Sequence, residues 1–408
     1  MQANKARIIR SILFVGCVFA VLLSSIVNYA TLPDPGTIER QSYLEGRLYQ
    51  NLPEFKAKAF LAHEYQDSFE QFAADSIPYR DSVMLGNAQL QRFGIESSNV
   101  FYGFRAYPTF FGSTYLACPE DEAIVEYPTS QSIVTPERLE ERRAAVEAAV
   151  REYPDINWRF ALVDRSRNSD SNPAHDLVSK HADYEYYRTG FLDKLPAECP
   201  YIDLSVGDSD RYFDYFFHTD HHAQIQGAID AYLKICESFA RKPIDNLQIE
   251  RVYDGPFYGS EARSGLIVSY SDVVDDVVKP SEKLVVIMNG KKLSMPYLNN
   301  GFSKDNTRYE PSERFANAYA EWFHTDVGEI HLINKQGEGS LLIIGDSFTN
   351  NVDYLFAYSY HDVFILDPRH YQGTLQSFLE KNQVEDALFL VAGNTLVNSD
   401  IKNFLEFS

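Results

Sequence analysis

Positive charge is scarce in this sequence, and neither internal repeats nor low-complexity tracts are present. Lysine and arginine number 37 against 58 acidic residues, so the formal net charge is −21. Such a chain repels a phosphate backbone, and no basic stretch interleaved with aromatic residues offsets the repulsion. The sequence therefore predicts no nucleic-acid partner. With 45% hydrophobic residues in 408 positions, it predicts a globular chain with a large core.

Cysteine is scarce as well. One of the four cysteines, Cys17, lies in an apolar N-terminal run, which leaves Cys118, Cys199 and Cys236 for the rest of the chain. Cys118 and Cys199 each precede a proline in loop-like sequence, and they are candidates for a disulfide because such bonds persist outside the cytoplasm. Three buried free thiols are the alternative.

A long uncharged run follows the first ten residues. Ser11–Ala30 contains twenty residues without a charge, and about 20 apolar residues span the hydrocarbon core of a bilayer. Basic residues flank the run only on its N-terminal side, so the positive-inside tendency puts residues 1–10 in the cytoplasm and the rest outside. A cleaved signal peptide would need a small residue where Asn28 stands. We therefore expect a single-pass anchor over 11–30 in the cell membrane, with the remainder of the chain outside the cytoplasm.

Two further segments are expected after the anchor. Residues 31–95 are predicted to be a linker and a juxtamembrane helical segment, in which the helical pattern of Glu54–Asp75 ends near Pro78. An α/β domain is predicted over 96–408. Its first clear helix is Thr135–Tyr153, which has a threonine N-cap and a proline in the first turn.

Short apolar runs alternate with helical patterns in the α/β domain. The strand-like runs are Ile156–Asp164, Leu341–Gly345, Asp362–Asp367 and Asp386–Gly393. Short, mostly apolar runs of this kind are typical of parallel strands that are buried on both faces. The pattern predicts a doubly wound parallel sheet. Glycines, tyrosines and short alternating runs at about 245–335 predict a β-rich insertion near the active face.

A candidate nucleophile follows one of these strands, in IIGDSFTN at Ile343–Asn350. Ser347 is expected at the carboxyl edge of the sheet, where α/β proteins bind ligands, and its amide is a candidate oxyanion donor. Gly-Asp-Ser is also a common turn and a good N-cap. The nucleophile interpretation therefore requires a base elsewhere in the chain.

HTDHHAQ, at His218–Gln224, offers such a base. In a regular helix, the side chains of Asp220 and His222 would point about 200° apart. They can cooperate only if Asp220 lies in the loop or cap before the following helix, where residues two apart share a side. We then expect Asp220 to bind one ring nitrogen of His222, the other nitrogen to face Ser347, and His221 to point away. A polar helix N-cap at Thr219 and Asp220 is the other interpretation.

Four motifs resemble those of the DHHW family, which is similar to the SGNH-like O-acetyltransferases of alginate biosynthesis. They are DSIPYRD at 75–81, TDHHA at 219–223, GDSFTN at 345–350 and ILDPRHYQG at 365–373. The resemblance implies an SGNH-hydrolase-like fold with Asp220, His222 and Ser347 as a catalytic triad. It also implies a substrate-facing role for Arg369, and Asn394 is the candidate for the asparagine of the ordinary SGNH set.

The sequence departs from the family pattern at two positions. The family has a tryptophan after the second histidine, where Ala223 stands here, and this puts the acceptor subsite in doubt. The residue before Asp-Ser is often lysine in the family, whereas Gly345 restores the esterase-like motif.

The resemblance also implies a function. It is that of a membrane-anchored extracytoplasmic serine-dependent O-acetyltransferase, or acetylesterase, acting on a cell-surface or exported polysaccharide through an acetyl-serine intermediate. The implied partners are the polysaccharide acceptor and a membrane-bound acyltransferase that supplies the acetyl group. Neither a cofactor nor a metal is expected.

Two other classes of protein fit parts of the sequence. A metal-dependent hydrolase would use the histidine cluster of His218–His222, with His324 and Asp326 completing its site. A non-catalytic polysaccharide-binding scaffold is the other, and Ala223 keeps that possibility open. Its tyrosines would stack on sugars, although tyrosines are more often core and rim residues. The candidates are Tyr184, Tyr186 and Tyr187.

Overall fold

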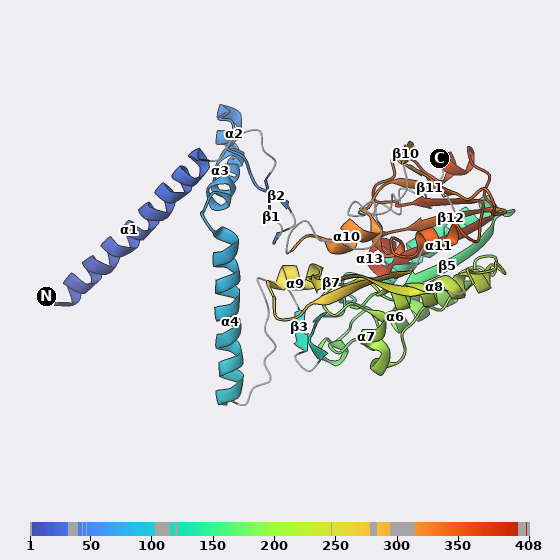
Figure 1. Cartoon of the computed structure of the whole chain (residues 1–408), viewed down its shortest axis with the longest axis horizontal. Coiled ribbons are helices and arrows are strands. Elements are labelled where there is room, and N and C mark those ends of the chain that lie inside the picture. Colours follow the sequence, from blue (N-terminus) through green and yellow to red (C-terminus); the bar gives the residue numbers. More distant parts are fainter. Residues whose placement is uncertain are drawn as a thin grey trace. The chain divides into compact units, whose positions relative to one another are not determined.

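The computed structural model describes most of the chain. The described residues are 2–31, 40–42, 44–45, 47–102, 115–118, 121–245, 247–277, 284–293, 315–398 and 405. They belong to two compact units, Met1–Ala106 and Tyr107–Ser408. Figure 1 labels the elements of both units.

The first unit is mainly helical. Its elements are α1 (Gln2–Ala30), β1 (Gln41–Ser42), β2 (Arg47–Leu48), α2 (Ala57–Leu61), α3 (Glu64–Asp75) and α4 (Arg80–Tyr102). The helix predicted over 54–75 is confirmed but interrupted, because His63 adopts a left-handed conformation with φ 66° between α2 and α3. The buried Asp75 carboxylate accepts hydrogen bonds from the Arg47 guanidinium at 2.7 and 2.8 Å. This ion pair holds the β1–β2 hairpin on α3.

Helix α1 contains the predicted apolar run. Within the described residues, Ile8–Ala30 is the one helical segment that is long and apolar enough to cross a membrane. Most of its large apolar side chains are exposed, so the first unit does not bury them itself. The apolar helix agrees with the expected anchor at 11–30, whereas its orientation stays a prediction.

The second unit is built on a mixed sheet of eight strands in the order β10-β9-β11-β13-β12-β14-β5-β6. Strands β13, β12, β14, β5 and β6 run parallel, and β11, β9 and β10 continue the sheet antiparallel. The strands are β5 (Asn157–Val163), β6 (Tyr201–Ile202), β9 (Val285–Met288), β10 (Lys291–Leu293), β11 (Glu329–Ile333), β12 (Ser340–Gly345), β13 (Asp362–Leu366) and β14 (Asp386–Ala392).

The sheet confirms the expected α/β class with one correction. All the predicted strand-like runs are strands, but the sheet is not parallel throughout. Part of the predicted insertion at about 245–335 extends the main sheet, because β9 turns directly into β10 and short turns join antiparallel strands. Another part, β7 (Ile249–Phe257) with β8 (Asp272–Val277), pairs separately.

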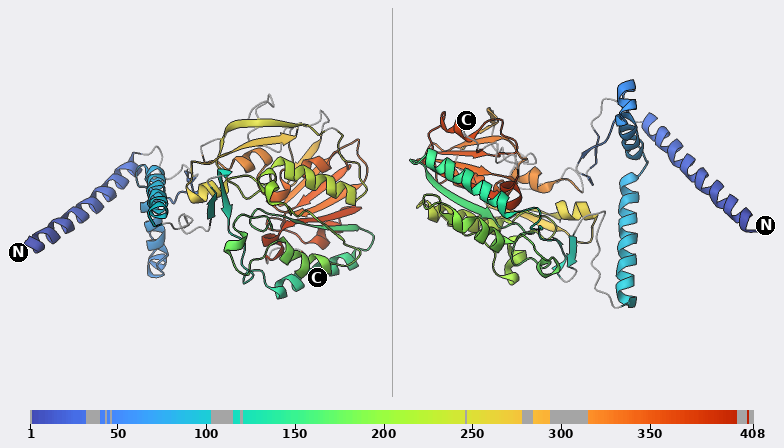
Figure 2. Two further views of the ribbon diagram at one scale, coloured as in Figure 1. Left: turned by 90° about the horizontal axis from the view of Figure 1, so that it is seen from below. Right: turned by 180° about the vertical axis from the view of Figure 1, so that it is seen from behind.

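Helices cover both faces of the sheet (Figure 2). Successive side chains of a strand point to opposite faces, so Leu342 and Ile344 join one hydrophobic cluster while Leu341 and Ile343 join another. Helices α5 (Pro136–Glu152), α6 (Tyr184–Gly190) and α12 (Leu375–Leu379) belong to the first cluster; α8 (Ile225–Ser238) and α11 (Asp353–Phe356) belong to the second. The remaining elements are β3 (Tyr115–Cys118), β4 (Ala123–Glu126), α7 (Tyr212–Tyr215), α9 (Ser260–Gly265), α10 (Ala318–Phe323) and α13 (Gly393–Leu396), with short 3₁₀ turns.

Burial and bonding decide two further expectations, one about tyrosines and one about cysteines. Tyr184 and Tyr187 are buried in the first cluster, and the partly buried Tyr186 donates its hydroxyl to Val134 O at 2.9 Å, so these tyrosines are packing residues rather than a sugar-binding surface. All four cysteine thiols are free, so no Cys118–Cys199 disulfide forms. Cys199 and Cys236 are buried as the alternative expected, whereas Cys118 is half-buried.

Candidate active site

Ser347 lies at the carboxyl edge of the sheet, directly after β12. Asp346 caps the short 3₁₀ turn Ser347–Thr349 by accepting from the Phe348 amide at 3.1 Å. Its second carboxylate oxygen accepts from the Ala392 amide at 2.9 Å, which ties the end of β12 to the end of β14. A Cβ added at Gly345 would overlap the Thr349 side chain. The lysine that the family often has at Gly345 therefore has no room here.

Asp220 and His222 lie in the loop between α7 and α8. Helix α8 begins at Ile225 with Gln224 as its N-cap, so Asp220 precedes the helix, as its cooperation with His222 requires. The alternative expectation, an N-cap at Thr219 and Asp220, is wrong. Thr219 instead binds Asp272 at the start of β8, through its amide at 2.8 Å and its hydroxyl at 2.6 Å. This contact fixes the loop from outside α8.

The structure brings Asp220, His222 and Ser347 into one hydrogen-bonded row. His222 Nδ1 lies 2.6 Å from Asp220 Oδ1, and His222 Nε2 lies 3.0 Å from Ser347 Oγ. A carboxylate only accepts, so in neutral His222 the Nδ1 atom carries the proton and Nε2 is free to accept from the serine hydroxyl. This tautomer is the one in which an imidazole can take a proton from Ser347.

The carboxylate of Asp220 is held in its ionised form. Burial alone would raise the pKa of Asp220, but the neighbouring imidazoles of His221 and His222 and two hydrogen bonds outweigh burial and hold the pKa well below its usual value. One of these hydrogen bonds comes from the Ser260 amide to Asp220 Oδ2 at 2.7 Å. An ionised Asp220 can orient His222 and stabilise its protonated form.

The two other histidines of the loop have partners of their own. His221 Nδ1 lies 2.6 Å from Ser260 Oγ, and burial together with the charge of His222 lowers the pKa of His221 well below its usual value. His218 Nδ1 lies 3.1 Å from Asp272 Oδ1, and this hydrogen bond raises the pKa of His218. His221 therefore binds α9, and among the described residues no hydrogen bond joins it to Ser347. The expectation that it points away from the site is wrong, because its ring lies against that of His222, with centroids 3.9 Å apart, and 5.7 Å from the Phe348 ring.

Three residues that the sequence did not single out complete the site. The Tyr319 ring stacks on His222 with centroids 3.8 Å apart and an angle of 5°, and its hydroxyl donates to Ser347 O at 3.0 Å. Ser260 is the second. Gly259 packs so closely against the loop that an added Cβ would overlap Asp220 Cβ and Thr219 O. No sequence pattern marked them, because each lies in a segment far along the chain from the histidine loop.

The predicted substrate residues share the carboxyl edge of the sheet with Ser347. The Arg369 guanidinium binds Asp367 at 2.6 Å and Asp326 at 2.9 Å. Asn394 is half-buried in α13, directly after β14. Among the described residues, no hydrogen bond joins Arg369 or Asn394 to the row of Asp220, His222 and Ser347. Their substrate-binding roles stay predictions.

The metal-hydrolase alternative loses two of its expected ligands. His324 Nε2 binds the buried Asp353 at 3.0 Å, and Asp326 binds Arg369, so neither joins the histidine loop. Ligand atoms of Asp220, His221 and His222 do lie within 4.8 Å of one another. Both ring nitrogens of His222 already have partners in Asp220 and Ser347, which favours the serine chemistry.

Ala223 borders a cavity of about 50 Å³ beside the site. Phe348 and Asp164 also line it, and the space suffices for a few water molecules. Burial raises the pKa of Asp164 well above its usual value. The small side chain of Ala223 thus borders a space that Phe348, the residue after Ser347, also lines.

These features define a class: an α/β protein with a hydrogen-bonded Ser-His-Asp row at the carboxyl edge of its sheet. Comparisons of the sequence with protein-family models and with curated proteins find no match. Solved structures do match. PatB1 of Bacillus cereus has a TM-score of 0.58 and 20% identity, over 71% of this chain and 98% of PatB1. The structure of PatB1 with a sulfonyl adduct gives 0.57 and 18%, over 71% and 99%.

A DHHW family protein from Eubacterium siraeum is similar to the same extent. Its TM-score is 0.54 and its identity 16%, over 70% of this chain and 93% of that protein. At such identities the likeness shows a shared fold. It confirms, at the level of the fold, the resemblance that the sequence motifs suggested.

Proposed function

We propose that this protein is a membrane-anchored, extracytoplasmic O-acetyltransferase, or acetylesterase, that acts on a cell-surface or exported polysaccharide. The observation that carries the proposal is the row of hydrogen bonds from Asp220 through His222 to Ser347, at 2.6 and 3.0 Å. A serine hydroxyl is a weak nucleophile until a base takes its proton, and a base oriented by a carboxylate is the usual solution.

The proposed reaction has two steps, formation of an acetyl-serine and its transfer. In the first, Ser347 Oγ attacks the carbonyl carbon of an acetyl donor while His222 Nε2 takes the hydroxyl proton. The bond between the acetyl carbon and the rest of the donor then breaks, the leaving group takes the proton from His222, and acetyl-Ser347 remains. In the second, His222 Nε2 takes the proton of a sugar hydroxyl, whose oxygen attacks the acetyl carbonyl carbon; the bond from that carbon to Ser347 Oγ then breaks, and His222 returns the proton to Ser347 Oγ. Water in place of the sugar gives hydrolysis. Asp220 stabilises the imidazolium in both steps.

Stabilisation of the tetrahedral oxyanion is assigned to the Ser347 amide. In the described part of the chain this amide donates to no carbonyl or side chain, since it begins the turn that Asp346 caps. Free N–H groups at such a position are suited to a developing negative charge. Arg369 lies at the same edge of the sheet, where it pairs with two carboxylates. We assign it a contact with the substrate.

The membrane and partner assignments rest on the sequence and on the fold neighbours. The apolar segment Ile8–Ala30 supports an anchor. PatB1, which shares the fold, has been solved with a sulfonyl adduct, and sulfonyl groups react with activated nucleophiles. The polysaccharide acceptor and a membrane-bound acyltransferase as acetyl supplier are carried over from the family resemblance.

A covalent probe tests the nucleophile directly. We expect a serine-directed phosphonate to label full-length protein in detergent on Ser347, as mapped by mass spectrometry of peptides. Labelling should be lost in His222→Ala and retained in His221→Ala, since His221 binds Ser260 rather than Ser347. Labelling of another residue, or equal labelling in His222→Ala, would contradict the proposal. Acetyl transfer is then separated from hydrolysis by adding oligosaccharides to an acetyl ester and measuring acetylated sugar.

A further inference from the structure

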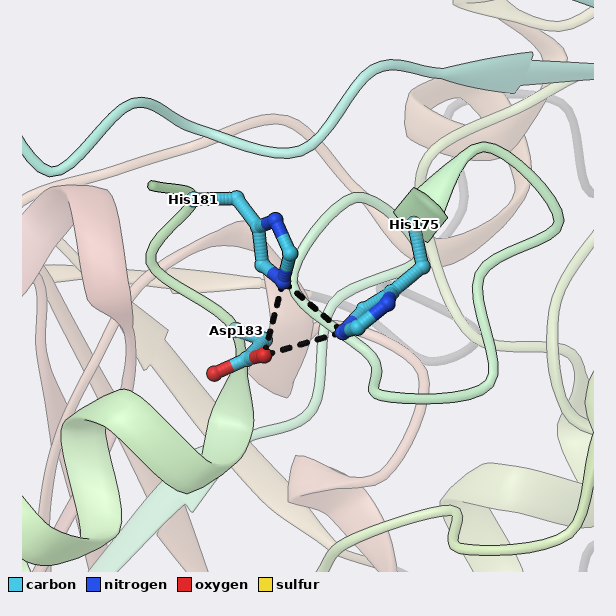
Figure 3. Close-up of side chains that lie close together, drawn as sticks. All are labelled: His175, His181 and Asp183. Carbon is cyan, nitrogen blue, oxygen red and sulfur yellow. Dashed lines mark hydrogen bonds and ion pairs between the residues drawn. The ribbon is translucent and has the colours of Figure 1, made fainter. Parts of the chain in front are cut away.

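A second cluster of histidines lies apart from the candidate active site, in the loop between β5 and α6. His175 Nε2, His181 Nε2 and Asp183 Oδ2 point at one another, with separations of 2.8 Å between the two nitrogens and 3.0 Å from each nitrogen to the oxygen. Figure 3 shows the three side chains converging from separate positions in the loop. Nothing in the proposed acetyl chemistry uses them.

The contacts of the outer nitrogens indicate where the protons of the two imidazoles sit. His181 Nδ1 lies 2.6 Å from the carbonyl oxygen of Val178, and His175 Nδ1 lies 3.3 Å from the Asp176 carboxylate. A carbonyl oxygen only accepts, so neutral His181 carries its proton on Nδ1 and presents a lone pair at Nε2. Neutral His175 has a carboxylate at each nitrogen, Asp176 at Nδ1 and Asp183 at Nε2, and it presents a lone pair at Nε2 when its proton sits on Nδ1. Asp183 Oδ1 accepts from the Tyr186 amide at 2.8 Å, which turns Oδ2 inward. With the His175 proton on Nδ1, three lone-pair atoms converge on one point.

Converging lone pairs repel one another unless a cation lies between them. Two imidazoles and a carboxylate are a ligand set that zinc and similar divalent ions accept, and their outer nitrogens already have the carbonyl and carboxylate partners that orient metal-binding histidines. Bonds of about 2.0–2.1 Å in a tetrahedral site place ligand atoms roughly 3.4 Å apart. The three atoms need to move apart by only about half an ångström. Their side chains are 15–29% exposed, which leaves room for that movement and for a water ligand.

The negative charge around the cluster also favours a cation. Asp170 interacts electrostatically with both Asp183 and His175 and lies in the same loop. Asp176 is adjacent to His175. Together with Asp183, three carboxylates therefore lie at or near the cluster.

We propose that His175, His181 and Asp183 bind a divalent transition-metal ion of the zinc class, with a fourth position open to water. The ion would pin the far end of the loop Asp164–Asp183, while Arg165 holds its near end by binding Glu126 at 3.0 Å. Arg165 also lies over the ring of Phe348, with 5.8 Å between its guanidinium carbon and the ring centroid. The metal thus stabilises a loop that contacts the residue after Ser347.

Cobalt and zinc binding to full-length protein in detergent tests this site. After metal removal, we expect Co²⁺ to bind at one ion per chain with visible absorption bands, and Zn²⁺ to displace it. The melting temperature should rise with Zn²⁺. His175→Gln should abolish the bands. Asp183→Asn should weaken binding while keeping the N-cap of α6, because asparagine caps helices as well as aspartate does.

Two matched variants locate the ion. His331→Gln removes a half-buried histidine that pairs with Asp362 and stacks on Phe364, and it should bind Co²⁺ like the wild type. His221→Ala should also bind it, because the active-site loop is a separate cluster. Folded protein that binds no Co²⁺ near stoichiometric concentration would overturn the proposal and indicate that a shared proton bridges the cluster. Binding lost in His221→Ala but kept in His175→Gln would put the metal in the active site instead.

Discussion

Two histidine–aspartate clusters in one molecule differ in what their inner nitrogen faces. In the active-site loop, Asp220 fixes His222 Nδ1–H, and Nε2 meets the Ser347 hydroxyl, which can donate. In the loop before α6, the Val178 carbonyl fixes Nδ1–H of His181, and the Nε2 atoms of His175 and His181 face each other and the Asp183 carboxylate. The first cluster joins a donor to each acceptor, whereas the second offers three ligand atoms to the cation that we propose. The same residue types are thus arranged for proton transfer in one place and for ligation in the other.

The sharpest separation of the two clusters comes from removing the serine or its base. We expect Ser347→Ala or His222→Ala to lower acetyl-ester turnover by roughly 10⁴-fold or more, the scale seen when triad members are lost. The double variant should be little worse than either single one, because the residues act as a unit. Turnover of a chromogenic acetyl ester by full-length protein, corrected for folded fraction by circular dichroism, measures this. Cobalt binding at His175 and His181 should be unchanged, and a joint loss of both would show that the clusters are coupled.

Replacement of the carboxylate should have the next largest effect. Asp220→Asn keeps the shape but favours the wrong tautomer of His222, and we expect a loss about tenfold to a hundredfold smaller than that of His222→Ala. The pKa of Asp220 is lowered in the fold, so its contribution to the free energy of unfolding is present above about pH 4 and is lost as the pH falls through the folded pKa. Acid unfolding curves of wild type and Asp220→Asn should therefore converge only below pH 4. Curves that converge between pH 5 and 7 would contradict an ionised Asp220.

The packing behind Asp220 gives a milder test. Gly259→Ala places a methyl group against Asp220 Cβ and Thr219 O, so the loop must shift away from α9. A shift of about 1 Å in a reacting group can cost on the order of 10²-fold in rate, and we expect a loss of about tenfold to a hundredfold with the fold preserved. Gly207→Ala, where an added Cβ meets no atom within 4 Å, is the control. Equal activity of the two variants would mean that Asp220 does not need its present position.

The sequence predicted the parts of this site that depend on local geometry. The strand β12 followed by Ser347 was visible as a buried apolar run, and the angle between residues two apart required Asp220 to precede α8. The antiparallel addition of β9 and β10 was missed although Asn289 and Gly290, both with positive φ, form the two-residue turn that such a pair favours.

Contacts that depend on tertiary structure could not be predicted. Tyr319 reaches His222 from α10, and Gly259 reaches Asp220 from the turn before α9. The second histidine cluster has spacing of the kind that metal sites use, with His175, His181 and Asp183 within nine residues. The convergence of their inner atoms depends on loop geometry that no periodicity encodes.

The smallest expected effect belongs to His221, and it decides which histidine of the pair is the base. Its imidazole binds Ser260 Oγ at 2.6 Å and packs beside the His222 ring, and among the described residues no hydrogen bond joins it to Ser347. We expect His221→Ala to retain turnover per folded molecule within about threefold of wild type, while losing about 1 kcal/mol of stability with its hydrogen bond. Ester turnover and urea unfolding of the same preparation measure the two effects separately. If His221→Ala is inactive while His222→Ala is active, the base is His221 and the assignment of His222 is wrong. If both are inactive and activity depends on added Zn²⁺, the loop binds a metal, and the contrast between the two clusters disappears.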